Sequence, residues 1–403
     1  MGRMRALLLA VSVLCMALIV TWLSTRGGVS YINLDNFLRD PLRFSALLLM
    51  PAVVAAGCLM AATLPRVVTI NLAVTIGLIG LLDTGARLLA PELPAIRGEP
   101  EAIGSSPFYV PDPTLGYVVA PCTVARHRRT IGETLIYDVV YRTDGRGRRE
   151  TPANPGPDRA SFVLWFGDSN VFGEGLSQTE TLPYYAGELA ADYRSYNYGV
   201  PGYGPSNVLA LARRGRLREE VTERDGYAVV FLIPAHVARV VGSSTMSTGW
   251  GRHFPYYVEG PRGEVLSAGD FVHGRPFVTM GYFLWAKSGL AEYSGVDLPI
   301  RYTADDYRVT AKVLKEANRL LAQQLVLRGF VVVLSQAYND AQLRVIEGVR
   351  EALALEGVPY LDYTGLYDTG DVRYRLAELD YHNSATTNRV IAARLVADLL
   401  HAR

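Results

Sequence analysis

Apolar residues near the start of the chain form three long runs. Residues 6–24 and 44–64 contain no charged side chain, and residues 67–82 form a third run that ends in a more polar stretch. An α-helix rises about 1.5 Å per residue, so about 20 apolar residues cross the roughly 30 Å hydrocarbon core of a bilayer. The pattern predicts about three transmembrane helices in a membrane module over residues 1–92. A cleaved signal peptide is the alternative for the first run, but no small-residue cleavage site follows it.

The remainder of the chain has a different pattern, in which short apolar runs alternate with segments of helical spacing. The continuous apolar runs are 161–166, 195–200, 227–233, 330–334 and 358–363. The segments of helical spacing are 181–193, 207–221, 304–328, 340–355 and 388–400. Continuous apolar strands separated by helices indicate a parallel sheet that is covered on both faces. With right-handed crossovers, residues 159–403 are predicted to form a three-layer α/β/α sandwich.

Two segments interrupt this alternation. Residues 93–158 start as a linker rich in proline and glycine and continue with strand-like alternation, which predicts a short β-rich lead-in. The basic turn 142–150 within it, RTDGRGRRE, is expected to be a solvated loop rather than an anion site. Residues 242–303 are irregular and rich in aromatic residues and glycine, which predicts an insertion in the large domain.

Composition excludes several classes of function. Lys+Arg is 40 and Asp+Glu is 39, for a net charge of +1, which argues against a nucleic-acid binder because such proteins carry a basic excess. The three cysteines are Cys15, Cys58 and Cys122, and their spacing excludes a disulfide framework and a CxxC metal or redox site. We expect neither a metal nor a cofactor, and protein partners cannot be named from the sequence.

Two candidate motifs follow the first two predicted strands. Gly167-Asp168-Ser169 comes directly after the first strand, where a turn would lift the serine Oγ off the sheet edge and leave amides free for an oxyanion. The alternative is a plain helix start, with Asp168 or Ser169 as the N-cap. Gly202 lies in the glycine-rich turn after the second strand, where a backbone amide can approach a ligand closely, although an ordinary strand–helix turn has the same composition.

A third candidate, Asp380-Tyr381-His382, precedes the last predicted helix. Residues two apart in extended chain point to the same side, so the Asp380 carboxylate can bond one nitrogen of His382 and fix its tautomer. The other nitrogen is then free to take a proton from a serine. The alternative is a histidine in a surface loop ahead of the final helix.

The order of these pieces resembles the SGNH/GDSL hydrolase superfamily over residues 160–402. The matching blocks are FGDSNVFGEGLSQTETLP, YNYGVPGYG and LDYHNSATTNRVIAARL. The resemblance implies a flavodoxin-like sheet of five parallel strands, with Ser169 as nucleophile, His382 as base and Asp380 as its orienting partner. It also implies an oxyanion hole formed by the amides of Ser169 and Gly202.

The sequence departs from the superfamily at one block. Where the family carries Gly-x-Asn-Asp after the third strand, this chain reads Leu232-Ile233-Pro234-Ala235-His236. Loss of one oxyanion donor costs about 3–4 kcal/mol in a typical hydrolase. Either His236 supplies the missing donor, or another group does, or the protein is a slow or inactive relative; a structural role for His236 is equally open.

Three functions fit these motifs. The first is a serine esterase that removes acyl groups, in particular O-acetyl groups, from an envelope or extracellular glycan through an acyl-serine intermediate. The second is an O-acyltransferase with the same triad, and the third is a weakly catalytic, glycan-binding assembly factor. Aromatic residues of the insertion would stack on sugar rings or, as the simpler alternative, pack in the core of a lid. They are Trp250, Phe254, Tyr256, Tyr257, Phe277, Tyr282, Phe283 and Trp285.

The predicted partners are an ester substrate and the lipid bilayer. Arginines flank the apolar runs on both sides, and their count alone leans toward a cytoplasmic large domain. Membrane-tethered members of the superfamily usually hold this domain outside the cytoplasm, so the resemblance implies a multi-pass membrane protein with an extracytoplasmic large domain.

Overall fold

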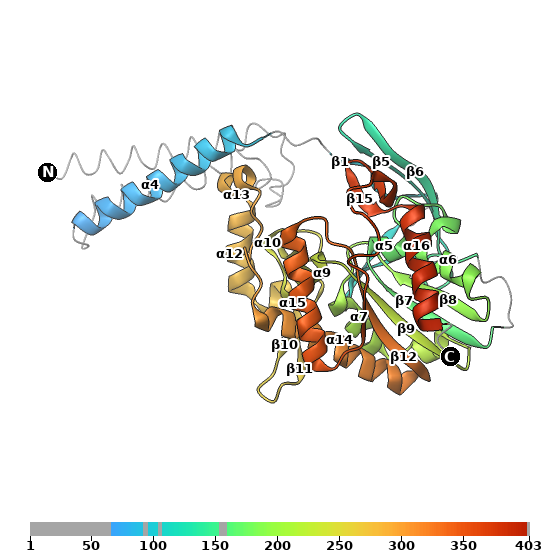
Figure 1. Cartoon of the computed structure of the whole chain (residues 1–403). Helices are drawn as coiled ribbons and strands as arrows, with labels where there is room; N and C mark the ends of the chain where they lie inside the picture. Colours follow the sequence, from blue (N-terminus) through green and yellow to red (C-terminus); the bar gives the residue numbers. More distant parts are fainter. Residues whose placement is uncertain (1–65, 92–95, 104–106, 153–158, 401–403) are drawn as a thin grey trace. The chain divides into compact units, whose positions relative to one another are not determined.

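A computed structural model of the chain describes residues 66–91, 96–103, 107–152 and 159–400 (Figure 1). The chain divides into two compact units. One contains Met1–Leu93 and Met280–Ile300, and the other contains Pro94–Thr279 and Arg301–Arg403. The sequence pattern assigns the whole insertion, residues 242–303, to the large domain, whereas the structure groups its last third with the N-terminal part of the chain.

A parallel sheet of five strands forms the centre of the large unit, as the alternation of apolar runs predicts. The strands are β7 (Ser161–Gly167), β8 (Tyr193–Gly199), β9 (Asp225–Leu232), β12 (Leu327–Leu334) and β13 (Tyr360–Asp362). Their spatial order is β13-β12-β9-β7-β8. If the five strands are numbered 1 to 5 in chain order and the sheet is read from β8 to β13, the order is 2-1-3-4-5. This is the flavodoxin-like arrangement, whose topological switch point lies between strands 1 and 3. Here that point lies between β7 and β9.

Helices cover both faces of the sheet (Figure 1). They are α6 (Leu182–Leu189) and α16 (Ala385–Leu395) on one face, and α7 (Pro205–Arg214), α14 (Ala304–Gln324) and α15 (Asp340–Glu356) on the other. Alternate residues of β7 serve the two layers: Leu164 and Phe166 pack with α7 and α14, and Val163 and Trp165 pack with α6 and α16. Both faces of a central strand are thus buried, which explains its continuous apolar sequence.

Local signals set the helix boundaries. The Thr303 side chain accepts a hydrogen bond from the Asp306 amide, and the Asp306 side chain reaches back to the Thr303 amide, so a capping box starts α14. The prediction of one helix over residues 207–221 is wrong at its centre. Gly215 ends α7 with φ of 70°, and a separate short helix, α8 (Leu217–Glu220), follows.

The predicted β-rich lead-in forms antiparallel strands in the large unit. β5 (Val124–Ile131) pairs with β6 (Thr134–Arg142) and also with β1 (Ile96–Arg97) and β2 (Glu101–Ala102). A separate hairpin joins β3 (Tyr109–Asp112) to β4 (Gly116–Val119).

The expectation of a solvated basic turn is wrong for Arg149, which is only 1% exposed. Its guanidinium donates to the carbonyls of Phe172, Gly173 and Leu176, and it lies over the ring of Tyr141. Burial lowers the pKa of Arg149 to about 10, so it stays charged at neutral pH. A short helix and the loop after it leave several carbonyls unpaired, and the buried guanidinium of Arg149 hydrogen-bonds them.

The insertion follows α9 (Ala235–Val241) and has a packed first part. Its elements are α10 (Ser244–Thr248), β10 (Pro255–Glu259), β11 (Val265–Asp270), α11 (Phe271–Gly274), α12 (Pro276–Ala286) and α13 (Gly289–Ser294). Phe254 and Phe271 are fully buried in one apolar cluster, so these aromatic residues pack in a core. Phe277 at the start of α12 is 82% exposed instead.

The N-terminal unit contains α4 (Arg66–Leu89), which covers the third apolar run. Arg87 of α4 pairs with Glu292 of α13 at 2.6 Å, and the Asp83 side chain accepts a hydrogen bond from the Gly289 amide at 2.7 Å. None of the helices in the described ranges is both long enough and apolar enough to cross a membrane, so the third run is confirmed as a helix but not as a span. The other two predicted spans, 6–24 and 44–64, lie outside the described residues.

Candidate active site

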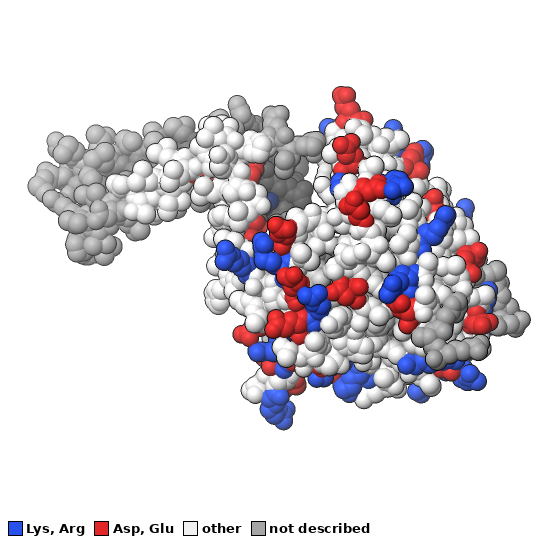
Figure 2. All heavy atoms as spheres, in the orientation of Figure 1, with Lys and Arg blue, Asp and Glu red and all other residues white. Residues whose placement is uncertain are grey.

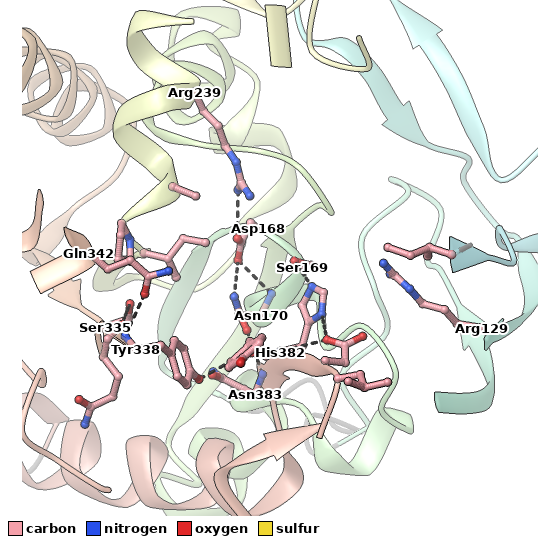
Figure 3. Close-up of a pocket in the computed structure, with 18 of the residues that line it drawn as sticks. Arg129, Asp168, Ser169, Asn170, Arg239, Ser335, Tyr338, Gln342, His382 and Asn383 are labelled. Carbon is pink, nitrogen blue, oxygen red and sulfur yellow. Dashed lines mark hydrogen bonds and ion pairs between the residues drawn. The ribbon is translucent and has the colours of Figure 1, made fainter. Parts of the chain in front are cut away.

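A pocket of about 280 Å³ lies at the carboxyl ends of the central strands (Figure 3). Its walls come from the segments that follow β7, β9 and β12 and from the strand β15 (Asp380–Asn383), which pairs with β14 (Arg375–Ala377). The lead-in adds Ile96, Arg129 and Ile131 to the lining. No residue of the insertion is among the described residues that line this pocket. Ligands of such sheets bind beyond the strand ends at the switch point, so this is the position expected for a substrate.

Ser169 begins a single-turn helix, α5 (Ser169–Phe172), directly after β7. Asp168 is the N-cap, and its Oδ1 accepts a hydrogen bond from the Asn170 amide at 2.9 Å. Gly173 ends the helix with φ of 84°, a conformation that favours glycine. The N-cap alternative therefore holds for Asp168, while Ser169 occupies the first helical position and lines the pocket.

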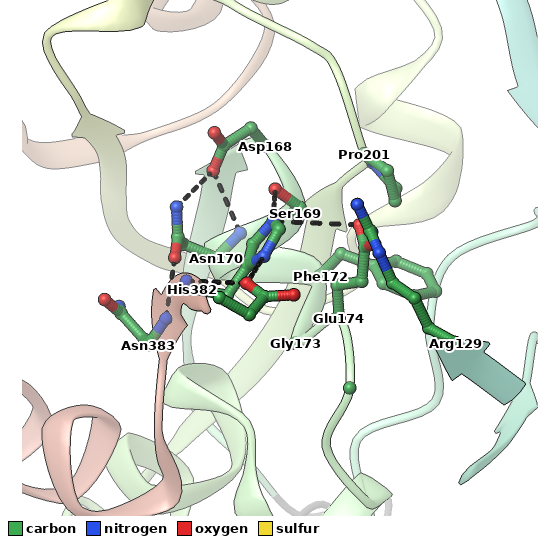
Figure 4. A network of polar contacts seen from close by, with 12 residues as sticks. Arg129, Asp168, Ser169, Asn170, Phe172, Gly173, Glu174, Pro201, His382 and Asn383 are labelled. Atoms are coloured by element: carbon green, nitrogen blue, oxygen red, sulfur yellow. Dashed lines mark hydrogen bonds and ion pairs between the residues drawn. The ribbon is translucent and has the colours of Figure 1, made fainter. Parts of the chain in front are cut away.

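The structure brings Ser169, His382 and Asp380 together from segments more than 200 residues apart (Figure 4). His382 Nε2 lies 2.8 Å from Ser169 Oγ, and Nδ1 lies 2.5 Å from Asp380 Oδ1. The same Oδ1 accepts a hydrogen bond from the His382 amide at 3.0 Å, which holds the carboxylate against the imidazole. A carboxylate can only accept, so Nδ1 carries the proton and Nε2 is left to accept one from the serine.

Charges around His382 favour its protonated form. Burial alone would lower the pKa of His382, but the hydrogen bond to Asp380 and the negative charges of Glu174 and Asp168 outweigh it and raise the pKa above its ordinary value. The pKa of Asp380 is lowered in spite of its burial, because His382 and Arg129 favour the carboxylate. The imidazole is therefore a stronger base than a free histidine.

Asn170, which was not predicted as a site residue, ties the serine turn to the histidine strand. Its Oδ1 accepts a hydrogen bond from the Asn383 amide at 3.0 Å, and its Nδ2 donates to Asp168 Oδ1 at 3.1 Å. Two elements that meet only in the folded chain are thereby fixed side by side (Figure 4). Its position next to Ser169 was the available signal, but no spacing in the sequence indicates its partner.

Glu174 is a second buried carboxylate near the imidazole. Its Oε2 lies 3.9 Å from His382 Nε2, and its Oε1 accepts hydrogen bonds from Arg129 Nη1 at 2.6 Å and from the Tyr137 hydroxyl at 3.0 Å. Arg129 and Tyr137 belong to the lead-in hairpin β5–β6. The lead-in thus supplies part of the electrostatic environment of His382. The sequence gives no sign of this, because Arg129 and Tyr137 lie far from Glu174 and His382 along the chain.

The two predicted oxyanion amides are free. Neither the Ser169 nor the Gly202 amide donates a hydrogen bond to any group of the described residues. Gly202 has φ of 88° in a turn closed by the Tyr203 amide on the Val200 carbonyl at 3.0 Å, and Pro201 precedes it, as in a type II turn. A side chain here would overlap the Tyr117 hydroxyl and Trp250, so the position requires glycine for two reasons. Gly202 is not among the described residues that line the pocket, so its role as a donor stays a prediction.

His236 does not face the pocket. Its ring is completely buried, with Nε2 3.4 Å from Asp168 Oδ2. Burial lowers the pKa of His236, so it is neutral at pH 7. His236 contacts Asp168 of the serine turn and is not among the described residues that line the pocket, so the structure does not bring it there as the predicted oxyanion donor.

Arg239, one turn along α9 from His236, lines the pocket instead. Its Nη1 donates to Asp168 Oδ2 at 3.0 Å and to the Tyr203 carbonyl at 2.7 Å. Burial alone would raise the pKa of Asp168, but His236 and Arg239 outweigh it and hold that pKa well below its usual range. Arg239 is thus the charged group that α9, the helix after the third strand, contributes to the pocket. The i, i+3 spacing from His236 was the signal that could have found it.

No group of three His, Cys, Asp or Glu side chains within the described ranges is arranged to hold a metal ion.

Comparisons with known proteins give structural likenesses at low identity. No family model and no curated protein matches the chain. A solved member of the lipolytic protein G-D-S-L family from Veillonella parvula is 12% identical, with 60% of this chain and 100% of that chain covered and a TM-score of 0.32. An aryl esterase of M. smegmatis is 10% identical, with 60% and 99% covered and a TM-score of 0.34. A carbohydrate esterase is 9% identical, with 77% and 99% covered and a TM-score of 0.34. The function proposed next rests on the pocket rather than on these likenesses.

Proposed function

We propose that the protein is a serine-dependent ester hydrolase of the SGNH type. The observation that carries this proposal is the continuous hydrogen-bonded chain from Ser169 through His382 to Asp380 within a pocket. A serine hydroxyl is a poor nucleophile unless an adjacent base takes its proton, and this geometry supplies that base. In the structure the base is in turn held by a buried carboxylate, as a serine triad requires.

The proposed reaction has two halves. Ser169 Oγ attacks the acyl carbon while its proton moves to His382 Nε2, and the carbonyl oxygen becomes an oxyanion that the Ser169 and Gly202 amides would bind. The C–O bond to the alcohol then breaks, and His382 gives its proton to the departing alkoxide oxygen. Water next attacks the acyl carbon and transfers a proton to His382 Nε2. The bond between the acyl carbon and Ser169 Oγ then breaks, and the imidazolium returns its proton to Oγ, which leaves a carboxylic acid and free Ser169.

The substrate class we propose is an acyl ester, in particular an O-acetyl ester, of a glycan outside the cytoplasm. The pocket is small, and Tyr338, Gln342 and Tyr381 line it. Tyr381 is exposed, and its ring meets that of Tyr338 edge to face at 5.0 Å. Exposed aromatic rings and side-chain amides suit sugar rings and hydroxyls better than a long acyl chain. The aromatic residues of the insertion do not line the pocket and carry no part of this proposal.

The test is hydrolysis of an ester panel by the purified full chain in detergent. We expect release of acetate from acetyl esters and from O-acetylated sugars, with little activity on long-chain esters. The same reactions with an unacetylated sugar acceptor distinguish the enzyme classes, since ester transfer to the acceptor would replace the hydrolase by an acyltransferase with the same triad. Binding of glycan without any turnover would overturn the enzymatic proposal in favour of a binding factor. Ser169→Ala is the matched control in every arm.

A further inference from the structure

Helix α12 is apolar around its whole circumference. Its 11 residues, PFVTMGYFLWA, include no charged side chain, and Thr279 is the one residue among them that is buried. Phe277, Met280 and Leu284 are exposed. An isolated helix that is apolar on every side is stable only in a protein core or in lipid. The described residues do not bury α12, so its environment must come from outside them.

The apolar character extends to α4, which belongs to the same unit as residues 280–300. Figure 2 shows the described part of α4 as an almost uncharged surface, in contrast to the mixed charges of the large unit. The exposed apolar residues of α4 are Val74, Leu78, Ile79, Leu81, Leu82, Leu88 and Leu89. Single exposed apolar residues are ordinary, but a concentration of this kind marks a site of interaction.

We propose that α12 lies in the interfacial region of a lipid bilayer, with Phe277, Met280 and Leu284 directed among the acyl chains. At about 1.5 Å per residue the helix is about 16 Å long, too short to cross a core of roughly 30 Å, so it lies in the surface rather than through it. Helices that lie in this region bury their apolar side chains about 5–10 Å deep, at the boundary of headgroups and chains.

The residues at the end of α12 favour lipid over a protein partner. Tyr282 and Trp285 are the aromatic types that concentrate at membrane interfaces, and the Trp285 Nε1 donates to the Val296 carbonyl at 2.9 Å, so its polar atom needs no water. Lys287 follows directly, with Nζ 5.8 Å from the centre of the Phe283 ring, where an ammonium suits a phosphate headgroup.

The adjoining helix α13 connects this segment to the part of the chain with the predicted spans. Arg87 of α4 binds Glu292 and also donates to the Lys287 carbonyl at 2.7 Å, and the buried Asp83 carboxylate accepts from the Gly289 amide. These polar contacts fix residues just after α12 to the helix that follows the uncharged runs 6–24 and 44–64. The uncharged, exposed helix α12 is thus joined through α13 to a helix that follows two predicted bilayer segments in the sequence, and this connection favours lipid as its environment.

Site-specific fluorescence in vesicles tests the proposal. The full chain, with its native cysteines replaced and a single Phe277→Cys change, is labelled with an environment-sensitive dye and reconstituted in vesicles of phosphatidylcholine and phosphatidylglycerol in equal parts. Leu355→Cys on α15 is the matched control, because Leu355 and Phe277 are both apolar and both 82% exposed. Met280→Cys repeats the measurement at a second site of α12.

At Phe277 and Met280 we expect emission shifted to shorter wavelength, with stronger quenching by nitroxides near the headgroup than by nitroxides near the chain end. The label at Leu355 should show emission typical of water and no quenching by either lipid. Water-like, unquenched emission at Phe277 would overturn the proposal. So would a shifted emission that no lipid nitroxide quenches, since that result would assign the surface to a second copy or another segment of this chain.

Discussion

Two aspartate–histidine pairs lie at the carboxyl edge of the same sheet, and only one has the geometry of a catalytic base. His382 holds Asp380 at 2.5 Å on one nitrogen and Ser169 at 2.8 Å on the other. His236 approaches Asp168 at 3.4 Å and has no hydrogen-bond partner on either nitrogen among the described residues. The pKa of the first histidine is raised, whereas burial lowers the pKa of the second.

The difference shows that an adjacent carboxylate is not sufficient to make a histidine a base. Asp380 has the imidazole as its main partner, so its charge acts on His382. Asp168 also binds Arg239 at 3.0 Å, and the complete burial of His236 together with the Arg239 charge outweighs Asp168, so the pKa of His236 is lowered. The first pair supports chemistry and the second supports the serine turn.

Removal of either the nucleophile or the base should abolish turnover. We predict that Ser169→Ala and His382→Ala each lower kcat by at least about 10⁴-fold, because nucleophile and base act as a unit, and that the double change is hardly worse than either alone. Steady-state hydrolysis of an acetyl ester measures the effect. If the kcat losses of the two single variants multiplied in the double variant, Ser169 and His382 would act independently rather than in one step.

Asp380→Asn should reduce the rate strongly but leave more activity than the first two changes. The carboxylate orients the imidazole and stabilises its charged form without exchanging protons itself, so we expect a loss of about 10²–10⁴-fold in kcat. Unfolding by urea should be nearly unchanged. A large loss of stability with a normal kcat per folded molecule would show that the Asp380–His382 pair is structural, like the Asp168–His236 pair.

Arg239→Met should act mainly on stability, because it leaves the fully buried Asp168 without its cation. Breaking a buried pair from one side costs about 3–5 kcal/mol of unfolding free energy. Urea denaturation measures the change, and Arg252→Met on the surface is the control. An unchanged midpoint would show that Asp168 does not depend on this arginine.

His236→Gln should lower stability modestly and leave the catalytic rate within a few-fold of the native value. Its ring packs behind Asp168 and does not reach the pocket. Comparison of kcat, KM and the urea midpoint separates the two effects. A selective fall in kcat with an unchanged midpoint would restore His236 as the donor that replaces the missing asparagine.

Glu174→Gln should shift the pH profile. The Glu174 charge raises the pKa of His382, and the base acts only when it is deprotonated, so activity rises with pH through that pKa. A neutral glutamine lowers the pKa, and the midpoint of log kcat/KM against pH should move to lower pH. Glu188→Gln on α6 is the exposed control. A midpoint that stays in place would limit Glu174 to a packing role.

The sheet could be predicted from sequence because its strands are buried on both faces and therefore read as unbroken apolar runs. The capping signals of α14 likewise lie in adjacent residues. The break at Gly215 was missed, since apolar residues continue at helical spacing on both sides of it. The long-range contacts of Arg149 were missed for a different reason: a guanidinium that satisfies backbone carbonyls leaves no periodic pattern.

The triad could be predicted because each member directly follows a β-run or stands beside its partner in the chain. Glu174, Arg129 and Tyr137 could not be connected in this way, because they meet through the packing of the lead-in against the loop after α5. The sequence left open whether His236 or another group replaces the block-three asparagine. The helix that starts after Pro234 turns the His236 side chain inward and brings Arg239 to the pocket.

The most direct test of the account is covalent labelling of the native protein by a fluorophosphonate. The reagent reacts with a serine only when a base activates it, so its adduct reports the Ser169–His382 pair independently of the natural substrate. We predict one stoichiometric adduct, mapped by mass spectrometry to Ser169, whose rate of formation rises with pH and is lost in His382→Ala. Ester turnover that persists in purified Ser169→Ala protein, or an adduct that forms at another serine and stops turnover, would contradict the central claim.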